Sequence, residues 1–180
     1  MLVSIDRSWA ICTPKKTGSQ SLQGMLADKA TVEGDFHGPV WFGEGKRVMV
    51  VREPYDRLAS MYWFSVAQGV GLFMGGTASE WLRKFVAGFG WKHKASYQEW
   101  VTSCSDLALV FRPDVVCRLE DGLELVFDAV GLERPEHIRH MNQTGNGKDQ
   151  RKSFAETFGS ADAATLAAVD EWCKPDLRWY

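Results

Sequence analysis

The chain has 180 residues, of which 45% are hydrophobic and 24% charged, and its net charge is -2. This length is enough for one sizeable core and too short for two ordinary domains, so we expect a single domain over residues 1–180. The slightly negative charge argues against a nucleic-acid-binding surface, so any anion site must be built locally.

The cysteines and the apolar runs indicate the setting of the protein. Its four cysteines form no CxxC pair and have no histidine at ligand spacing, so we expect no zinc site. We find no secretory signal pattern and no run of about 20 apolar residues. We therefore expect a cytoplasmic protein with no stable membrane insertion and no nucleic-acid partner.

The first elements are a strand, a turn and a helix. The apolar run Trp9–Cys12 predicts a strand, and apolar residues at helical spacing predict a helix after Gly18, namely Leu22, Met25 and Leu26. The glycine-rich residues 31–45 break any helical period, so they predict a loop or a short edge strand.

A second strand and helix follow. Residues 47–52 (RVMVVR) form a continuous β-branched run, which is typical of a strand buried on both faces of a parallel sheet. Pro54 then begins a helix that ends near Gly69. The alternation of strands and helices predicts an α/β fold with a parallel sheet.

The second half of the chain gives weaker signals. We expect short helices at 79–89 and 96–104, a strand at 114–119 and a helix that begins with Asp121-x-x-Glu and ends near Gly131. A polar, basic loop at 139–152 precedes a last helix at 162–173, which Pro175 follows.

The turn after the first strand has the composition of an anion site. Backbone N–H groups and a helix start favour a phosphate or sulfate, and Lys16 adds a mobile charge. Small hydroxyl residues add donors, namely Thr17, Ser19 and Ser21. The ATP-binding loop of nucleotide triphosphatases has its lysine after the last glycine, whereas Lys16 precedes Gly18, so that interpretation fails on spacing.

A second anion site is indicated after the second strand. Arg52 lies at the carboxyl end of that strand, where α/β sheets bind ligands, and its planar guanidinium suits phosphate. Arg57 and Ser60 follow on the next helix. The simpler alternative is that Arg52 and Arg57 are surface charges of an ordinary strand-helix unit.

Both motifs resemble those of sulfotransferases that use 3'-phosphoadenosine-5'-phosphosulfate. Residues 16–22 (KTGSQSL) are similar to their 5'-phosphosulfate loop, and residues 52–62 are similar to their 3'-phosphate segment, RxPxxRxxSxY. The likeness covers roughly the first third of the chain. It implies a P-loop-like three-layer fold with a central parallel sheet flanked by helices, as in carbohydrate and Golgi-type members.

The resemblance also implies a cofactor site and a reaction. The cofactor would contact the turn that contains Lys16 (the lysine turn), the second motif and a late basic loop. The residues are Lys15, Lys16, Thr17, Gly18, Ser19, Gln20, Ser21, Arg52, Ser60, Lys148 and Arg151. Lys16 would stabilise the leaving oxygen, and His37 would take the proton of the acceptor. Glu33 or Asp35 is the alternative base.

The acceptor is the least specified part of this hypothesis. We expect a hydroxyl or amine of a glycan, lipid or small molecule, which would meet Phe36, Trp41 and Trp63, and no metal. Two other functions remain open. One is a P-loop nucleotide or small-molecule kinase, and the other is a catalytically silent nucleotide-binding module.

Overall fold

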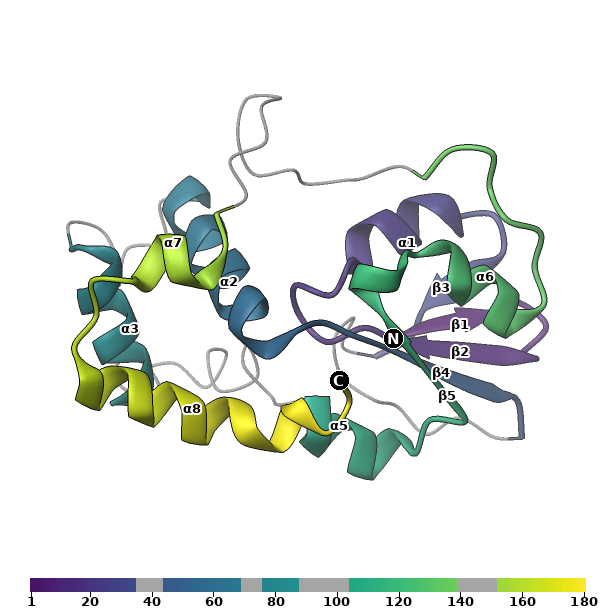
Figure 1. The fold of residues 1–180 in the computed structure, drawn as a ribbon. Coiled ribbons are helices and arrows are strands. Elements are labelled where there is room, and N and C mark those ends of the chain that lie inside the picture. Colours follow the sequence, from purple (N-terminus) through teal and green to yellow (C-terminus); the bar gives the residue numbers. More distant parts are fainter. Residues whose placement is uncertain (35–43, 69–75, 88–103, 139–151) are drawn as a thin grey trace. The chain divides into compact units, whose positions relative to one another are not determined.

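A computed structural model describes residues 1–34, 44–68, 76–87, 104–138 and 152–180 (Figure 1). The chain divides into two compact units. Unit 1 consists of residues 1–53, 102–142 and 179, and unit 2 of residues 54–101, 143–178 and 180. The expected single domain over residues 1–180 stays a prediction.

Unit 1 is built on a five-stranded sheet in the order β3-β1-β2-β4-β5. Its strands are β1 (Leu2–Ser4), β2 (Trp9–Cys12), β3 (Ala30–Val32), β4 (Lys46–Val51) and β5 (Val115–Arg118). β2, β4 and β5 are parallel, as predicted, whereas β1 is antiparallel to both β2 and β3. The sheet is therefore mixed, and the prediction of a purely parallel sheet was wrong. A short turn joins β1 to β2, and such a turn can connect only antiparallel strands.

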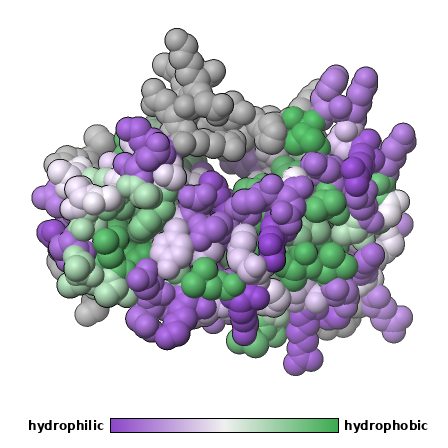
Figure 2. Space-filling model, in the orientation of Figure 1, coloured by the Kyte–Doolittle hydropathy of each residue, from purple (hydrophilic) through white to green (hydrophobic). Residues whose placement is uncertain are grey.

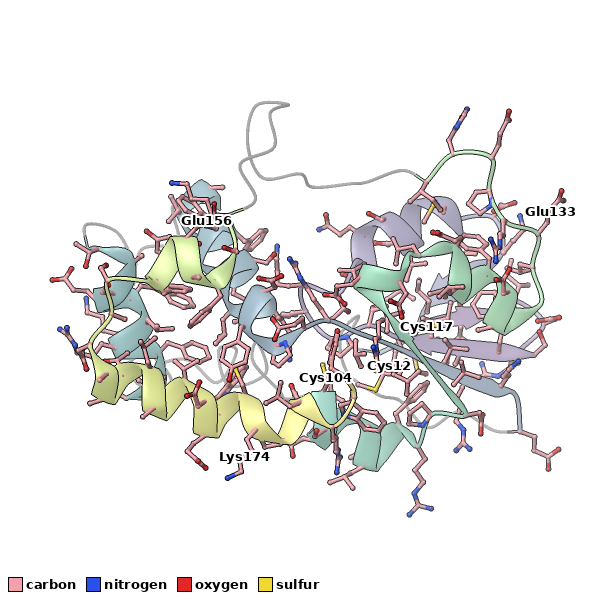
Figure 3. All side chains as sticks on the ribbon, viewed as in Figure 1. Cys12, Cys104, Cys117, Glu133, Glu156 and Lys174 are labelled. Carbon is pink, nitrogen blue, oxygen red and sulfur yellow. The ribbon has the colours of Figure 1, made fainter. Side chains whose placement is uncertain are left out.

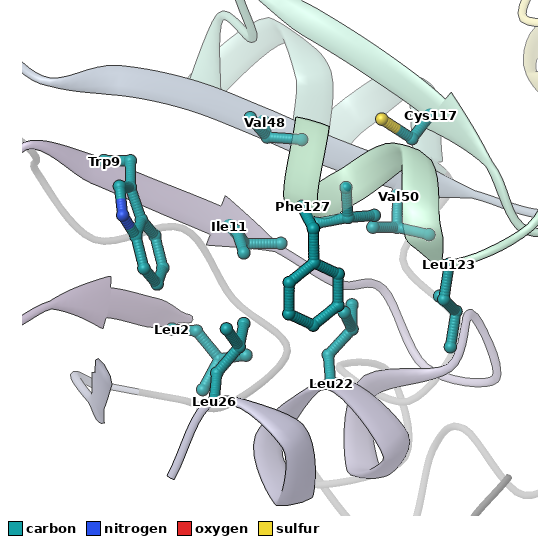
Figure 4. Close-up of a cluster of buried hydrophobic side chains, with 11 residues drawn as sticks. Leu2, Trp9, Ile11, Leu22, Leu26, Val48, Val50, Cys117, Leu123 and Phe127 are labelled. Atoms are coloured by element: carbon teal, nitrogen blue, oxygen red, sulfur yellow. The ribbon is translucent and has the colours of Figure 1, made fainter. Parts of the chain in front are cut away.

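Helices cover both faces of this sheet. α1 (Ser19–Met25) and α6 (Glu124–Val130) share a core with alternate strand residues, among them Ile11, Val48 and Val50 (Figure 4). α5 (Cys104–Phe111) packs against β4. Its Cys104 neighbours Cys12, whose side chain points away from that core because strand side chains alternate (Figure 3).

The cysteines are part of this packing. All four are free and buried. Burial raises the pKa of Cys12 to about 12, so its thiol is protonated and behaves as a small apolar group.

Two elements of unit 1 differ from the sequence prediction. α5 was not predicted, because the expected helix at 96–104 ends where α5 begins. Most of residues 96–104 lie outside the described residues. The helix start expected at Asp121 was also wrong. Residues Leu119–Asp121 form a 3-10 turn, η2, and α6 begins only at Glu124, with Leu123 as its N-cap.

Unit 2 is helical in its described residues. It contains α2 (Pro54–Gln68), α3 (Ala78–Val86), α7 (Phe154–Phe158) and α8 (Ala163–Leu177). Aromatic rings form much of its core. Trp81 stacks on Phe85 and Phe158 with ring centroids 5.3 and 5.9 Å apart, and Tyr62 meets Trp81 edge-on. Trp9 and Trp81 are both core residues, so these two tryptophans serve packing.

α8 continues beyond the expected end at Cys173 and includes Pro175. A proline removes one backbone donor, which a last turn tolerates better than a helix centre. The next residue, Asp176, is 2% exposed and forms an ion pair with Arg57 of α2, which is 1% exposed, at 3.3 Å between Nη1 and Oδ2. This buried pair links the last turn of α8 to α2.

The described helices are all too short or too polar to cross a membrane. On the face drawn in Figure 2, hydrophilic residues are interspersed with smaller apolar patches.

Candidate functional site

The candidate site lies at one edge of the sheet in unit 1. β2, β4 and β5 are parallel, so their carboxyl ends meet at the same edge. The residues that follow these strands are Thr13, Arg52 and Leu119. In α/β sheets this is the edge at which ligands bind.

The lysine turn is bent by two residues in the left-handed region. Lys16 has a φ of 71° and Gly18 a φ of 85°, directly before α1 begins at Ser19. Thr17 is buried, and both its N–H and its Oγ1 donate to the carbonyl of Pro14, at 3.2 and 2.6 Å. The hydroxyl of Thr17 therefore helps to shape the turn, and its expected contact with an anion stays a prediction.

Gly18 is also closely enclosed by its neighbours. A Cβ at this position would lie 3.0 Å from Cδ1 of Leu119 and 3.2 Å from Cδ2 of Leu123. Glycine is the residue that tolerates both the positive φ and this close approach. The segment after β5 thus packs directly on the lysine turn.

Lys16 and Arg52 meet at this edge, as the sequence predicted. Arg52 Nη1 donates to the carbonyl oxygen of Lys16 at 3.4 Å. Burial, and secondly the positive charge of Arg52, lower the pKa of Lys16 to about 8. Because two like charges are brought together at a half-buried place, an anion bound between them would be stabilised by both.

Glu120 also contacts the segment that carries Arg52, and this residue was not predicted from the sequence. Its Oε1 accepts the backbone N–H of Glu53 at 3.0 Å. The register of β4 and β5 indicates that Glu120 lies near Glu53. Val51 pairs with Arg118, so Glu53 and Glu120 each stand two residues beyond the last pair.

The remaining predicted residues of the turn differ in exposure. Ser19 and Ser21 are buried, Lys15 is half-buried and Gln20 is exposed. Residues 15–21 form one continuous turn and helix start. Within it, the pKa of Lys16 is lowered by the positive charge of Arg52.

The second motif is divided between the units. Arg52 belongs to unit 1, whereas Arg57 and Ser60 belong to unit 2. Arg57 is buried in its ion pair with Asp176, so the alternative of a surface charge is wrong for Arg57. Ser60 is half-buried on α2, and its expected phosphate contact stays a prediction.

The candidates for base and acceptor binding are mostly outside the described residues. These are Asp35, Phe36, His37 and Trp41, and the late basic residues Lys148 and Arg151. Glu33 is described, and its Oε1 accepts from Arg7 Nη1 at 2.7 Å.

Trp63 is described too. Its Nε1 donates to Thr157 Oγ1 at 3.1 Å, and Lys152 Nζ lies 5.6 Å from its ring centroid. Both contacts lie within unit 2, and the expected contact of half-buried Trp63 with an acceptor stays a prediction.

Comparison with known proteins adds no assignment. The chain matches no family model, no curated protein and no solved structure.

Proposed function

We propose that the protein is a sulfotransferase that moves the sulfuryl group of 3'-phosphoadenosine-5'-phosphosulfate to a hydroxyl or amine by in-line displacement. The observation that carries the proposal is the pairing of Lys16 with Arg52, through the 3.4 Å contact of Arg52 Nη1 with the Lys16 carbonyl. These two residues come from the two motifs that resemble the two phosphate-binding segments of that family. The finer fold, a P-loop-like three-layer arrangement centred on the sheet of unit 1, belongs to the same proposal.

The residues at the sheet edge fit such a cofactor. It carries anionic groups at the 3' and 5' positions of its ribose, and the edge offers two cations from the turns that follow neighbouring parallel strands. Lys16 and the N–H groups around Gly18 would hold the 5'-phosphosulfate, with Ser19 and Ser21 beside them, and Arg52 would hold the 3'-phosphate. When bound, the cofactor supplies an activated sulfuryl group with a good leaving group.

The chain's own residues would supply positioning and charge. A protonated Lys16 stabilises negative charge that develops on an oxygen next to its ammonium, and its partly buried location strengthens this effect. Arg52 orients the nucleotide, since its planar guanidinium can contact a phosphate with two parallel bonds. The base that takes the acceptor proton is His37 in this proposal, on the resemblance alone.

Transfer can be tested directly with the whole chain. Wild type is incubated with 3'-phosphoadenosine-5'-phosphosulfate and a mixture of phenols, sugars and amines, and formation of adenosine 3',5'-bisphosphate is followed by chromatography. We expect acceptor-dependent formation that Lys16→Met lowers at least about 100-fold, a loss typical of removing one transition-state donor. Bisphosphate formation that does not depend on Lys16 would contradict the proposal.

A parallel incubation addresses the kinase alternative. Magnesium-ATP replaces the sulfated cofactor, with the same acceptors and the same Lys16→Met control. We expect no phosphoryl transfer, because the lysine precedes the glycine of the turn. Lys16-dependent phosphoryl transfer would assign the site to a kinase instead.

A further inference from the structure

The segment after β5 contacts both cationic loops of the site. Leu119 and Leu123 pack on Gly18 of the lysine turn, and Glu120 Oε1 accepts the backbone N–H of Glu53, directly after Arg52. All of these residues belong to unit 1. One short segment thus fixes the turns that carry Lys16 and Arg52.

The hydrogen bond from the Glu53 N–H to the Glu120 side chain lies just beyond the last backbone pair of β4 and β5. The ladder between β4 and β5 finishes with Val51 opposite Arg118. β4 has ended before Arg52, and the chain after Arg118 turns into η2, so the backbone pairing stops there. The Glu120 carboxylate supplies one more acceptor, and it does so at the peptide next to Arg52.

We propose that Glu120 is a positioning residue, which sets the direction of the Arg52 guanidinium by fixing the Arg52–Glu53 peptide. The expected effect on nucleotide binding rests on the proposed function. A charged acceptor makes a stronger bond to a backbone N–H than a neutral one, so the Glu120 carboxylate can restrain the Arg52–Glu53 peptide, which lies beyond the last pair of β4 and β5. Glu120 itself would not touch the nucleotide.

Three variants separate positioning from charge. Glu120→Ala removes the acceptor and one negative charge. Glu120→Gln removes the charge and keeps an acceptor oxygen. Asp121→Ala is the matched control, because Asp121 is an exposed carboxylate of the same 3-10 turn. Removing a negative charge near a cation site would by itself favour anion binding, so a loss in Glu120→Ala alone cannot come from charge.

The binding experiment compares two ligands by calorimetry, adenosine 3',5'-bisphosphate and adenosine 5'-phosphosulfate, which lacks the 3'-phosphate. Glu120→Ala should weaken the bisphosphate about tenfold without weakening the 5'-phosphosulfate, since a charge-assisted hydrogen bond has roughly that effect. Glu120→Gln, which keeps an acceptor oxygen, and Asp121→Ala should bind both ligands at least as tightly as wild type, since each removes a negative charge near the cations. Equal losses for both ligands, or the same loss in Asp121→Ala, would overturn the proposal.

A second measurement does not depend on the nucleotide. Hydrogen exchange at the Glu53 amide, in the protein alone, should be faster in Glu120→Ala than in wild type and nearly restored in Glu120→Gln. Unchanged exchange in Glu120→Ala would refute positioning by Glu120. Failure of wild type to bind the bisphosphate would instead refute the proposed function, so the two failures are distinguishable.

Discussion

Two arginines of one sequence motif have opposite surroundings. Arg52 stands at the sheet edge of unit 1, where its neighbour is another cation, Lys16. Arg57 lies inside unit 2, where it pairs with the carboxylate of Asp176 and is 1% exposed. An arginine that already has a buried carboxylate partner serves the fold, whereas one placed beside a second cation favours an external anion. The comparison teaches that the partner, and not the motif position, separates the structural arginine from the binding one.

The largest expected effect is a loss of stability on replacing Arg57, the structural arginine. Arg57→Leu removes the arginine that pairs with the buried Asp176 carboxylate, which should lower the free energy of unfolding by about 3–5 kcal/mol. Urea denaturation followed by circular dichroism measures it. Arg52→Leu is the matched control and should change the unfolding free energy by less than about 1 kcal/mol, because Arg52 is only half-buried and lies outside the Arg57–Asp176 pair.

A double variant tests whether the loss comes from breaking the ion pair. Arg57→Leu combined with Asp176→Leu should recover much of the stability, because replacing both ions by apolar groups is often nearly neutral. A double variant as unstable as Arg57→Leu would show that packing, and not the ion pair, causes the effect.

The next effect is on binding. Lys16→Met should weaken adenosine 3',5'-bisphosphate by about 1.5–3 kcal/mol, the usual contribution of a hydrogen bond to a charged group. Its unfolding free energy near pH 7 should stay the same or rise, because the variant removes a partly buried charge that stands beside Arg52. Calorimetry and urea denaturation on the same samples give both numbers. A variant that loses stability and binding together would place Lys16 with Arg57, as a structural residue.

Most of the sheet edge that holds Lys16 could be predicted from the sequence, whereas the structural role of Arg57 could not. The strand, turn and helix from Trp9 to Met25 were predicted correctly because hydrophobic period, glycine position and helix start are local signals. The pairs Arg57–Asp176 and Glu53–Glu120 join residues 119 and 67 positions apart, and no local pattern specifies such contacts. The short strand β1 was also missed, since three residues give too little alternation to detect.

A smaller effect concerns the shape of the lysine turn. Gly18→Ala combines a φ of 85° with a Cβ only 3.0 Å from Leu119, so it should destabilise the fold by about 1–2 kcal/mol and weaken anion binding. Gly24→Ala, within α1, is the control and should stabilise by about 0.5–1 kcal/mol. Thermal unfolding of both variants measures the difference. Similar effects at the two glycines would contradict the described turn.

The smallest expected effect is a pH dependence of binding. The pKa of Lys16 is lowered to about 8 in the free protein, and a bound anion would raise it again. Affinity for the bisphosphate should therefore be constant from pH 7 to about 8 and then fall with rising pH, by at most about tenfold per unit. Calorimetry in buffers from pH 7 to 10 follows this fall. Lys16→Met should lack it, and an equal slope in that variant would assign the titration to another group.

The central claim is that Arg52 and Lys16 bind one doubly phosphorylated adenosine. Calorimetric titration of adenosine 3',5'-bisphosphate into wild type and Arg52→Ala tests it most directly, with Arg83→Ala, an exposed arginine of unit 2, as the control. We expect one binding site in wild type, affinity at least about tenfold weaker in Arg52→Ala, and no change in Arg83→Ala. Equal affinity in wild type and Arg52→Ala would contradict the account.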